Sequence, residues 1–246
     1  MSDTLLLDVQ GVSKYFGGLR ANEDISFQVN RREIVSIIGP NGAGKSTLFS
    51  CVTGFHRVDS GKVLFKGQDI TNRKPHTIAR LGIVRTFQIV QVISDMTVLE
   101  NVMTGGFLRH SRVADVRRKA EEILTFTGLI EKQSYNALEL TISDKKRLEM
   151  SMALAMDPEL IMLDESMAGL TPVELRQIIE LIRNVRASSV TIVVVEHVME
   201  AVMELSDRVI VLNSGRKVME GSPEEVVANP EVKRAYLGER YSAVSQ

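Results

Sequence analysis

Short apolar runs separated by polar turns predict strands in the first third of the chain. LLLDVQ and DISFQV are bounded by GG, NE and RR pairs, which is typical of an antiparallel section. EIVSIIG is a nearly continuous apolar run with several β-branched residues, the pattern of a strand buried in a parallel sheet. STLFSCVTG then predicts a helix that ends at Gly54, and SGKVLFKGQDI predicts a hairpin.

The middle of the chain has helical periodicity instead. The apolar positions that follow this spacing are Val113, Val116, Ala120, Ile123 and Leu124. We therefore expect a helical subdomain over about residues 95–156, inserted into a core made of residues 1–94 and 157–246. The whole chain is then a single domain.

Strand and helix patterns alternate after this segment. ELIMLD and SVTIVVVE predict buried strands, and RVIVLNSGRKVME predicts two strands about a turn. The helices between and after them carry start signals. Thr171 and Glu174 form a predicted capping box with Pro172 at the first helical position, and Ser222 and Glu225 repeat the box. The alternation predicts an α/β fold with a mainly parallel sheet.

Composition narrows the class of protein. The 246 residues are 44% hydrophobic, which is enough for a sizeable core. Lys and Arg number 30 against 31 Asp and Glu, and this balance argues against a nucleic-acid partner. Cys51 is the only cysteine, so no intrachain disulfide forms. The start lacks a basic leader, and no apolar run approaches the ~18 residues of a membrane span. We expect a cytoplasmic protein that reaches a membrane through a partner.

GPNGAGKST, residues 39–47, has the spacing of a phosphate-binding loop between a strand and a helix. Gly39, Gly42 and Gly44 allow the backbone to turn its N–H groups around a phosphate, and the following helix points its positive end at the same oxygens. Lys45 is expected to reach the β- and γ-phosphates and Ser46 to hold Mg²⁺. A glycine-rich turn with a solvated lysine is the competing interpretation.

LIMLDE, residues 160–165, places two acids at the end of a predicted strand, where open α/β sheets bind ligands. Asp164 suits a Mg²⁺ shell, and Glu165 is positioned to polarise an attacking water. Alone, an apolar strand that ends in acids is weak evidence. Together with the phosphate loop it predicts a P-loop nucleotide hydrolase.

With these motifs in this order, the chain resembles the ATP-binding cassette (ABC) family over nearly its whole length. GPNGAGKST matches the Walker A loop, LIMLDE matches Walker B, and LTISDKKRLE occupies the place of the signature segment. GIVRTFQ, SMAGLTP and ANPEVKRAYLGER are most similar to the ATP-binding subunits of branched-chain amino acid uptake systems.

The resemblance implies roles that single residues do not establish. Gln88 falls at the Q-loop position, where it would contact Mg²⁺ and water, and His197 falls at the switch histidine, where it would contact the γ-phosphate. Taken alone, Gln88 is an ordinary strand-end amide and His197 a structural histidine. The expected catalytic residues are Lys45, Gln88, Glu165 and His197, and the expected metal ligands are Ser46, Gln88 and Asp164.

The resemblance also implies how ATP is held. VSKYFGG looks like the adenine-stacking segment, with Phe16 expected to stack, Tyr15 as its rival, and a core position as the alternative for Phe16. IVQVI after Gln88 is expected either to form a groove for a membrane-subunit helix or to enter the core. The expected ATP-contacting residues are Phe16, Gly39, Asn41, Gly42, Ala43, Gly44, Lys45, Ser46, Thr47 and, toward a partner's nucleotide, Thr141 and Ser143.

The signature segment departs from the family pattern. Family members dimerise head to tail, and each signature closes on the partner's ATP. Here Ile142 and Ser143 stand where glycines are expected, and Asp144 stands for a glutamine. Isoleucine is poorly suited to close approach. A carboxylate facing a phosphate costs about 3 kcal/mol per unit charge at roughly 5 Å and an effective dielectric of about 20. We therefore hypothesise an asymmetric pairing with a different ATPase chain.

The sequence as a whole predicts the ATP- and Mg²⁺-dependent ATPase subunit of an importer for branched-chain or related amino acids. Expected partners are integral-membrane permease subunits, a second ATPase subunit and, indirectly, a solute-binding protein, with the chain peripheral on the inner face of the membrane. Two alternatives remain: the ATPase of a lipid or polysaccharide exporter, and an ATP-dependent switch with little turnover.

Overall fold

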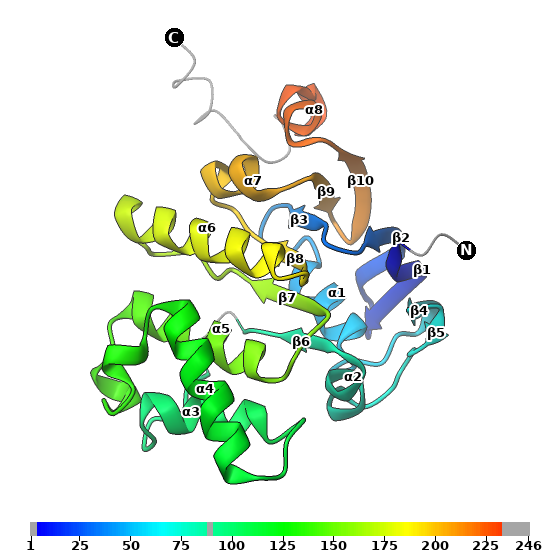
Figure 1. Ribbon diagram of the computed structural model, residues 1–246. Coiled ribbons are helices and arrows are strands. Elements are labelled where there is room, and N and C mark those ends of the chain that lie inside the picture. Colours follow the sequence, from blue (N-terminus) through cyan, green and yellow to red (C-terminus); the bar gives the residue numbers. More distant parts are fainter. Residues whose placement is uncertain (1–3, 88–90, 233–246) are drawn as a thin grey trace.

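Two sheets form the centre of the protein (Figure 1). The computed structural model describes residues 4–87 and 91–232. Within them, six strands form one sheet in the order β10-β9-β3-β8-β7-β6, and every neighbouring pair is parallel except β9 with β10. Its strands are β3 (Ile34–Ile38), β6 (Ile83–Arg85), β7 (Leu160–Asp164), β8 (Thr191–Val195), β9 (Arg208–Asn213) and β10 (Arg216–Gly221). The predicted mainly parallel sheet is confirmed.

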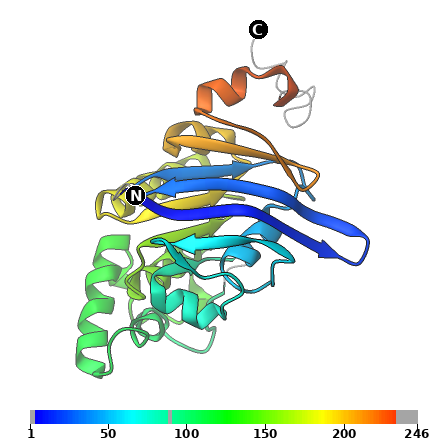
Figure 2. The same cartoon turned by 90° about the vertical axis from the view of Figure 1, so that its right-hand side faces the viewer.

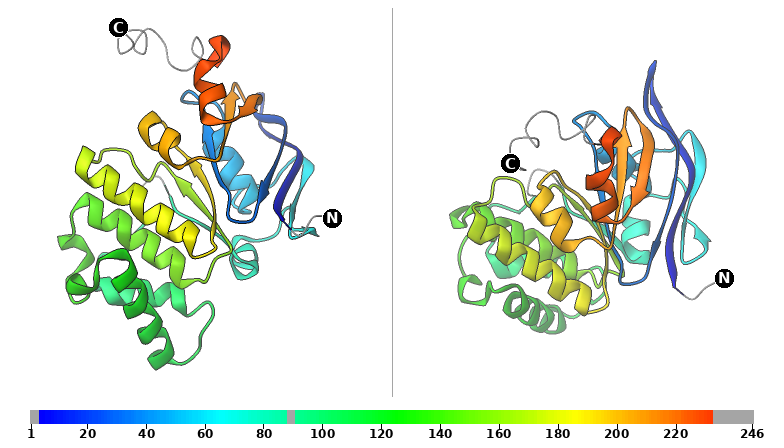
Figure 3. Two further views of the ribbon diagram at one scale, coloured as in Figure 1. Left: turned by 45° about the horizontal axis from the view of Figure 1, so that its top comes forward. Right: turned by 90° about the horizontal axis from the view of Figure 1, so that it is seen from above.

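The chain begins with an antiparallel sheet, as the sequence predicts. Four described strands follow the order β2-β1-β4-β5: β1 (Leu5–Phe16), β2 (Leu19–Asn30), β4 (Ser60–Phe65) and β5 (Gln68–Asp69). Figures 2 and 3 show this sheet on the side of the parallel sheet opposite to the layer of α4 (Val113–Thr127), α5 (Ile142–Ala155) and α6 (Pro172–Ala187).

The parallel strands are buried on both faces, which explains their continuous apolar runs. Successive side chains of β7 enter different cores because the side-chain period of a strand is two. Leu160 and Met162 join the cluster of the antiparallel sheet and α1, whereas Ile161 and Leu163 join the cluster of the helical layer. The parallel strands, and with them their carboxyl ends, are therefore held in place between two packed layers.

The helices begin where the sequence places their caps. Side-chain capping boxes at Thr171 with Glu174 and at Ser222 with Glu225 are confirmed, and a third at Thr97 with Glu100 was not predicted. The helices are α1 (Lys45–Val52), α2 (Pro75–Leu81), α3 (Val98–Gly106), α4 (Val113–Thr127), α5 (Ile142–Ala155), α6 (Pro172–Ala187), α7 (Met199–Leu205), α8 (Pro223–Ala228) and α9 (Pro230–Val232), with 3-10 turns at Ile130–Lys132 and Ala137–Glu139.

Helix α1 ends two residues before the predicted position. The Thr53 hydroxyl and amide both donate to the Phe49 carbonyl, at 2.6 and 3.0 Å, and close the last turn. Gly54 then turns the chain at a φ of 78°. The glycine is thus the residue beyond the cap, a usual place for glycine after a helix.

Helices α3, α4 and α5 pack against one another beside the sheet (Figure 1). Their buried residues, such as Val102, Val116 and Leu148, belong to the same cluster as Ile161 and Leu163 of β7. Because that cluster is shared, the division into a core and a helical subdomain stays a prediction.

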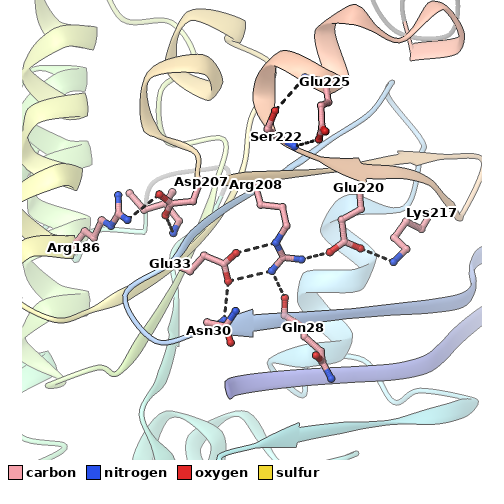
Figure 4. Close-up of polar contacts among 11 residues, drawn as sticks. Gln28, Asn30, Glu33, Arg186, Asp207, Arg208, Lys217, Glu220, Ser222 and Glu225 are labelled. Carbon is pink, nitrogen blue, oxygen red and sulfur yellow. Dashed lines mark hydrogen bonds and ion pairs between the residues drawn. The ribbon is translucent and has the colours of Figure 1, made fainter. Parts of the chain in front are cut away.

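A half-buried arginine joins the two sheets (Figure 4). Nε of Arg208 donates to Glu33 at 2.9 Å, Nη2 donates to the Gln28 carbonyl at 2.6 Å, and Nη1 pairs with Glu220. The guanidinium therefore links the end of β2 with β9 and β10.

Candidate functional site

The loop between β3 and α1 has a backbone that requires glycine. A Cβ on Gly44, whose φ is 97°, would lie 2.2 Å from the Ala21 carbonyl oxygen. A Cβ on Gly39 would lie 2.2 Å from the carbonyl oxygen of Leu212. Both contacts are far inside van der Waals range and involve rigid backbone. Side chains are therefore excluded here, and the loop closes tightly against β2 and β9.

Lys45 lies inside this loop at the first position of α1, and its residue is only 5% exposed. Its Nζ donates to the carbonyl oxygens of Gly39 and Pro40, at 2.7 and 3.0 Å. Burial lowers the pKa of the ammonium, and the charges of Glu165 and Asp164 act against that shift. Two neutral carbonyl groups thus hold the ammonium over the loop. An anion that binds in the loop can replace them as acceptors.

The carboxyl end of β7 brings Asp164 to the same loop. Oδ1 of Asp164 lies 3.5 Å from the Ser46 hydroxyl, and the aspartate is 1% exposed. Its Oδ2 accepts a bond of 2.6 Å from Arg85, a residue of β6 that the sequence did not single out. The Arg85 guanidinium lies between the rings of Phe49 and Phe87 and also donates to Ser50.

Glu165 and His197 face one another across neighbouring strands. Oε2 of Glu165 lies 3.5 Å from Nε2 of His197. The Glu165 backbone has a φ of 51°, uncommon outside glycine, and its N–H donates to the Val195 carbonyl at 2.9 Å. Strained residues of this kind cluster at functional sites. The strain turns the acid out of the strand direction toward the histidine.

A cleft of about 410 Å³ opens above these groups. The expected residues that line it are Phe16, Asn41, Gly42, Ala43, Gly44, Lys45, Ser46, Thr47 and Glu165. Leu19, Arg20 and Ala21 line it as well and were not predicted, because only the close approach of β2 to the loop places them there.

The Phe16 ring is half-exposed at one end of this cleft. His56 meets the ring edge-on, with centroids 5.3 Å apart, and the Lys14 ammonium lies 5.1 Å from its centroid. Its rival Tyr15 is not among the lining residues. Phe16 therefore lies at the surface of the cleft rather than in the core.

Other expected positions lie elsewhere. Gln88, Ile89 and Val90 lie outside the described residues. Of the rest of that apolar run, Val92 packs against the helical core and Ile93 is exposed.

The signature segment forms the start of α5 and does not line the cleft. Thr141 caps the helix by accepting from the Asp144 amide at 3.1 Å. The Asp144 carboxylate accepts from the Thr141 hydroxyl and pairs with Lys132 at 2.5 Å. Ser143 is buried, whereas Ile142 is 65% exposed at the tip of the helix. The exposed tip thus presents the Ile142 side chain beside the capping Thr141.

Comparison with known proteins gives the family. Residues 22–168 match the family model described as "ABC transporter". The chain belongs to the ABC transporter family. Residues 216–242 also match a model described as "Branched-chain amino acid ATP-binding cassette transporter". The protein is an ATP-binding ATPase of this family.

Named relatives cover almost the whole chain. The "High-affinity branched-chain amino acid transport ATP-binding protein LivG" of Salmonella typhimurium is 41% identical over 95% of this chain and 98% of its own. A probable LivG of Archaeoglobus fulgidus is 37% identical over 97% and 98%.

Solved structures agree with the fold. A nucleotide-free ATP-binding cassette from an ABC transporter superposes with a TM-score of 0.88 at 33% identity, over 96% of this chain and 100% of that one. A cassette in its ADP conformation gives 0.87 at 33% identity, over 96% and 99%. Within the described residues, no helix has the length and apolarity to cross a bilayer.

Proposed function

We propose that this ABC ATPase energises the uptake of branched-chain or related amino acids. The observation that carries the proposal is the match of residues 216–242 to the branched-chain amino acid cassette model, since that segment lies outside the general ABC match at residues 22–168. The whole-length similarity to LivG proteins supports the same cargo class. Integral-membrane permease subunits carry the cargo, and a solute-binding protein delivers it to them. The ATPase acts on the inner face of the membrane.

Uptake of radiolabelled leucine tests this cargo. Cells that lack the chain are expected to lose uptake, and the wild-type chain but not Lys45→Ala restores it. Undiminished leucine uptake, together with a defect in lipid or polysaccharide export, contradicts the proposal and favours the exporter. A third result favours the switch: Lys45→Ala abolishes uptake, but the purified chain with its permeases shows no measurable ATP turnover.

ATP lies in the cleft above the β3–α1 loop. The adenine stacks on the half-exposed Phe16 ring, and the phosphates accept from the backbone N–H groups of residues 41–47. Lys45 exchanges its carbonyl partners Gly39 and Pro40 for phosphate oxygens. The N-terminus of α1 has no side-chain cap, so its N–H groups are available for the same phosphates.

The residues near Asp164 fit Mg²⁺. Hard oxygen ligands suit this ion, which is usually held by one or two carboxylates together with substrate phosphates and water. The Ser46 hydroxyl and the Asp164 carboxylate supply two such oxygens side by side. The described residues contain no cluster of three or more His, Cys, Asp or Glu, as is expected when the nucleotide completes the shell. Gln88 is the third proposed ligand. The ion neutralises phosphate charge when bound.

Glu165 is the general base in this proposal. Its carboxylate faces the cleft and polarises the attacking water, and His197 contacts the γ-phosphate. Glu165→Gln keeps the shape but removes the base. We expect ATP affinity within about twofold of wild type and hydrolysis slowed by about 10²- to 10⁴-fold. Equal hydrolysis by wild type and Glu165→Gln contradicts the assignment.

The partner in the dimer is a second, different ATPase chain. Thr141 and Ser143 are the groups this chain offers to the partner's nucleotide, but Ser143 is buried and the exposed Ile142 side chain projects from the helix tip. Asp144 is already paired with Lys132, so the steric obstacle of Ile142 outweighs charge repulsion. The heterodimer then has two unequal ATP sites. The site between this chain's Walker A loop and an intact signature of the partner is the more active one.

Matched changes in the two chains test the asymmetry. Glu165→Gln in this chain is expected to abolish most hydrolysis by the heterodimer, whereas the equivalent substitution in the partner has a small effect. Equal losses from both substitutions contradict the asymmetric pairing while leaving the ATPase assignment intact.

A further inference from the structure

Three charged side chains lie beneath the site and have no role in the chemistry above. Glu149 and Glu196 are buried, at 9% and 0% exposure, and Lys146 is half-buried between them and the site. Burying charge is costly unless it is paired and hydrogen-bonded. The contacts of these three side chains therefore show what keeps them in place.

Glu149 holds the chain after β6. Its Oε1 accepts from the Phe87 amide at 2.9 Å, and the Gln91 amide also donates to the carboxylate. Burial raises the pKa of Glu149 to about 7 in spite of these N–H groups. One side chain of α5 thus fixes both described ends of the segment that contains Gln88.

Lys146 holds the chain after β7. It precedes Glu149 by one helical turn, so the two side chains share one face of α5. Its Nζ donates to the Ala168 carbonyl at 2.6 Å. Burial lowers the pKa of Lys146, and Glu196, Glu149 and Glu165 act in the opposite direction. The same face of α5 therefore contacts two loops of the site.

Glu196 connects the loop after β7 to the loop after β8. Its Oε1 accepts from the Met167 amide at 2.8 Å, and it directly precedes His197. Its Oε2 is buried with no hydrogen-bond partner in the part of the chain that is described. Burial raises the pKa of Glu196 to about 7, opposed by backbone N–H groups and the Lys146 charge.

These contacts form a continuous series along the carboxyl edge of β6, β7 and β8, which are neighbours in the sheet. It runs from the Phe87 and Gln91 amides through α5 to the Met167–Ala168 segment and then to Glu196. Asp164, Glu165 and His197 lie at the same edge.

We propose that Glu149, Lys146 and Glu196 are positioning residues that hold Phe87 and Gln91, the loop bearing Glu165 and the loop bearing His197 in fixed register with helix α5. A shift of α5, whose first residues form the signature, is thereby passed to the groups that act on ATP. The inference rests on the roles proposed above for Glu165 and His197. None of the three side chains lines the cleft.

The substitution Glu149→Gln tests the series with little change of shape. A glutamine retains one oxygen acceptor but turns an NH₂ group toward a backbone donor, so it can keep only one of the two amide contacts. Glu196→Gln keeps the Met167 contact through Oε1 but turns its NH₂ group toward the His197 and Val198 amides. Glu122→Gln, exposed on α4, makes the same change in charge and is the matched control.

The heterodimer of the full-length chain with its partner ATPase is assayed for steady-state ATP hydrolysis, ATP affinity and hydrogen–deuterium exchange. For Glu149→Gln we expect kcat to fall by about 10- to 100-fold with KM within about twofold, since small displacements of catalytic groups have effects of this size. Exchange is expected to accelerate in residues 165–168 and 196–198, which Glu149 does not touch. Glu196→Gln is expected to lower kcat in the same direction, whereas Glu122→Gln is expected to retain the activity.

Unchanged kcat in Glu149→Gln overturns the proposal, and so does exchange that accelerates only around Phe87 and Gln91, which indicates a local structural role. A uniform acceleration of exchange with a large loss of melting temperature also overturns it. Glu165→Gln is measured alongside. If that variant is fully active, the proposed site itself is wrong, whereas an inactive Glu165→Gln with a normal Glu149→Gln rejects the series alone.

Discussion

The Arg85 guanidinium donates a hydrogen bond of 2.6 Å to the Asp164 carboxylate, and both side chains are almost completely buried. The pair joins β6 to the carboxyl end of β7, directly beneath the phosphate loop. Arg85 thus compensates the charge of a proposed metal ligand inside the fold, and it does so from β6 within the GIVRTFQ stretch, where the sequence pattern predicted no role for Arg85 itself.

Arg85→Met leaves the Asp164 charge buried and uncompensated. Removing one partner of a buried ion pair typically costs about 3–5 kcal/mol, so we expect a loss of that order in the free energy of unfolding. Urea denaturation measures it. Arg85→Lys keeps the charge but cannot reach both Ser50 and Asp164, and is expected to lose less. A stability loss below about 1 kcal/mol for Arg85→Met, the size of an exposed pair, contradicts this account.

The phosphate loop offers a matched pair of glycine substitutions. Gly44→Ala places a Cβ 2.2 Å from a backbone oxygen, whereas a Cβ on Gly42 meets nothing within 4 Å among the described residues. Both have positive φ, at 97° and 80°, so both substitutions strain the backbone. We expect Gly42→Ala to cost about 1–2 kcal/mol of unfolding free energy and Gly44→Ala at least about 1–3 kcal/mol more. Equal costs would falsify the claim that β2 constrains the loop.

Restoring glycines to the signature tests the obstacle at the tip of α5. Ile142→Gly with Ser143→Gly is expected to raise hydrolysis at the partner's site in the heterodimer, because backbone can then approach the phosphate. The partner's nucleotide turnover is isolated by adding Glu165→Gln to this chain. The helix is expected to lose about 1 kcal/mol per glycine, visible in the melting midpoint. Ile142→Ala, with a smaller side chain but no glycine, is the control, and no gain from either variant contradicts the steric explanation.

We expect the free energy of unfolding to decrease as the pH rises from weakly acidic to weakly basic values. Burial raises the pKa of both Glu149 and Glu196 from 4.5 to about 7. The folded state therefore binds these protons more tightly than the unfolded chain does. Their contribution is complete below about pH 4.5 and is lost as the pH rises through about 7, by up to about 3 kcal/mol for each group.

Denaturant melts at about pH 5 and pH 8 measure this slope. Glu149→Gln and Glu196→Gln each remove one titrating group, so each is expected to flatten the dependence by up to about half. The exposed control Glu122→Gln leaves it unchanged. A wild-type stability that rises over this range contradicts the assignment, since it indicates carboxylates with lowered rather than raised pKa.

The sequence by itself determined the local elements and the chemistry of the loop. Capping boxes at Thr171 and Ser222, continuous apolar runs and the GPNGAGKST spacing depend on interactions between residues close in the chain. Because such interactions act within a short segment, β3, β7, β8, the phosphate loop and the start of α6 lie within about two residues of their predicted places. The strands β1 and β2 extend well beyond the predicted stretches LLLDVQ and DISFQV.

The tertiary structure alone decided which distant residues share the site. Arg85 meets Asp164, β2 lines the cleft, and Asp144 turns to Lys132 because strand order and helix packing bring separate segments together. The partners of Glu149 and Glu196 are backbone N–H groups, which every residue but proline carries, so no residue type in the sequence marks them. Composition and spacing indicate the chemistry of a side chain, but the residue that it contacts is determined only by how the sheets and helices pack.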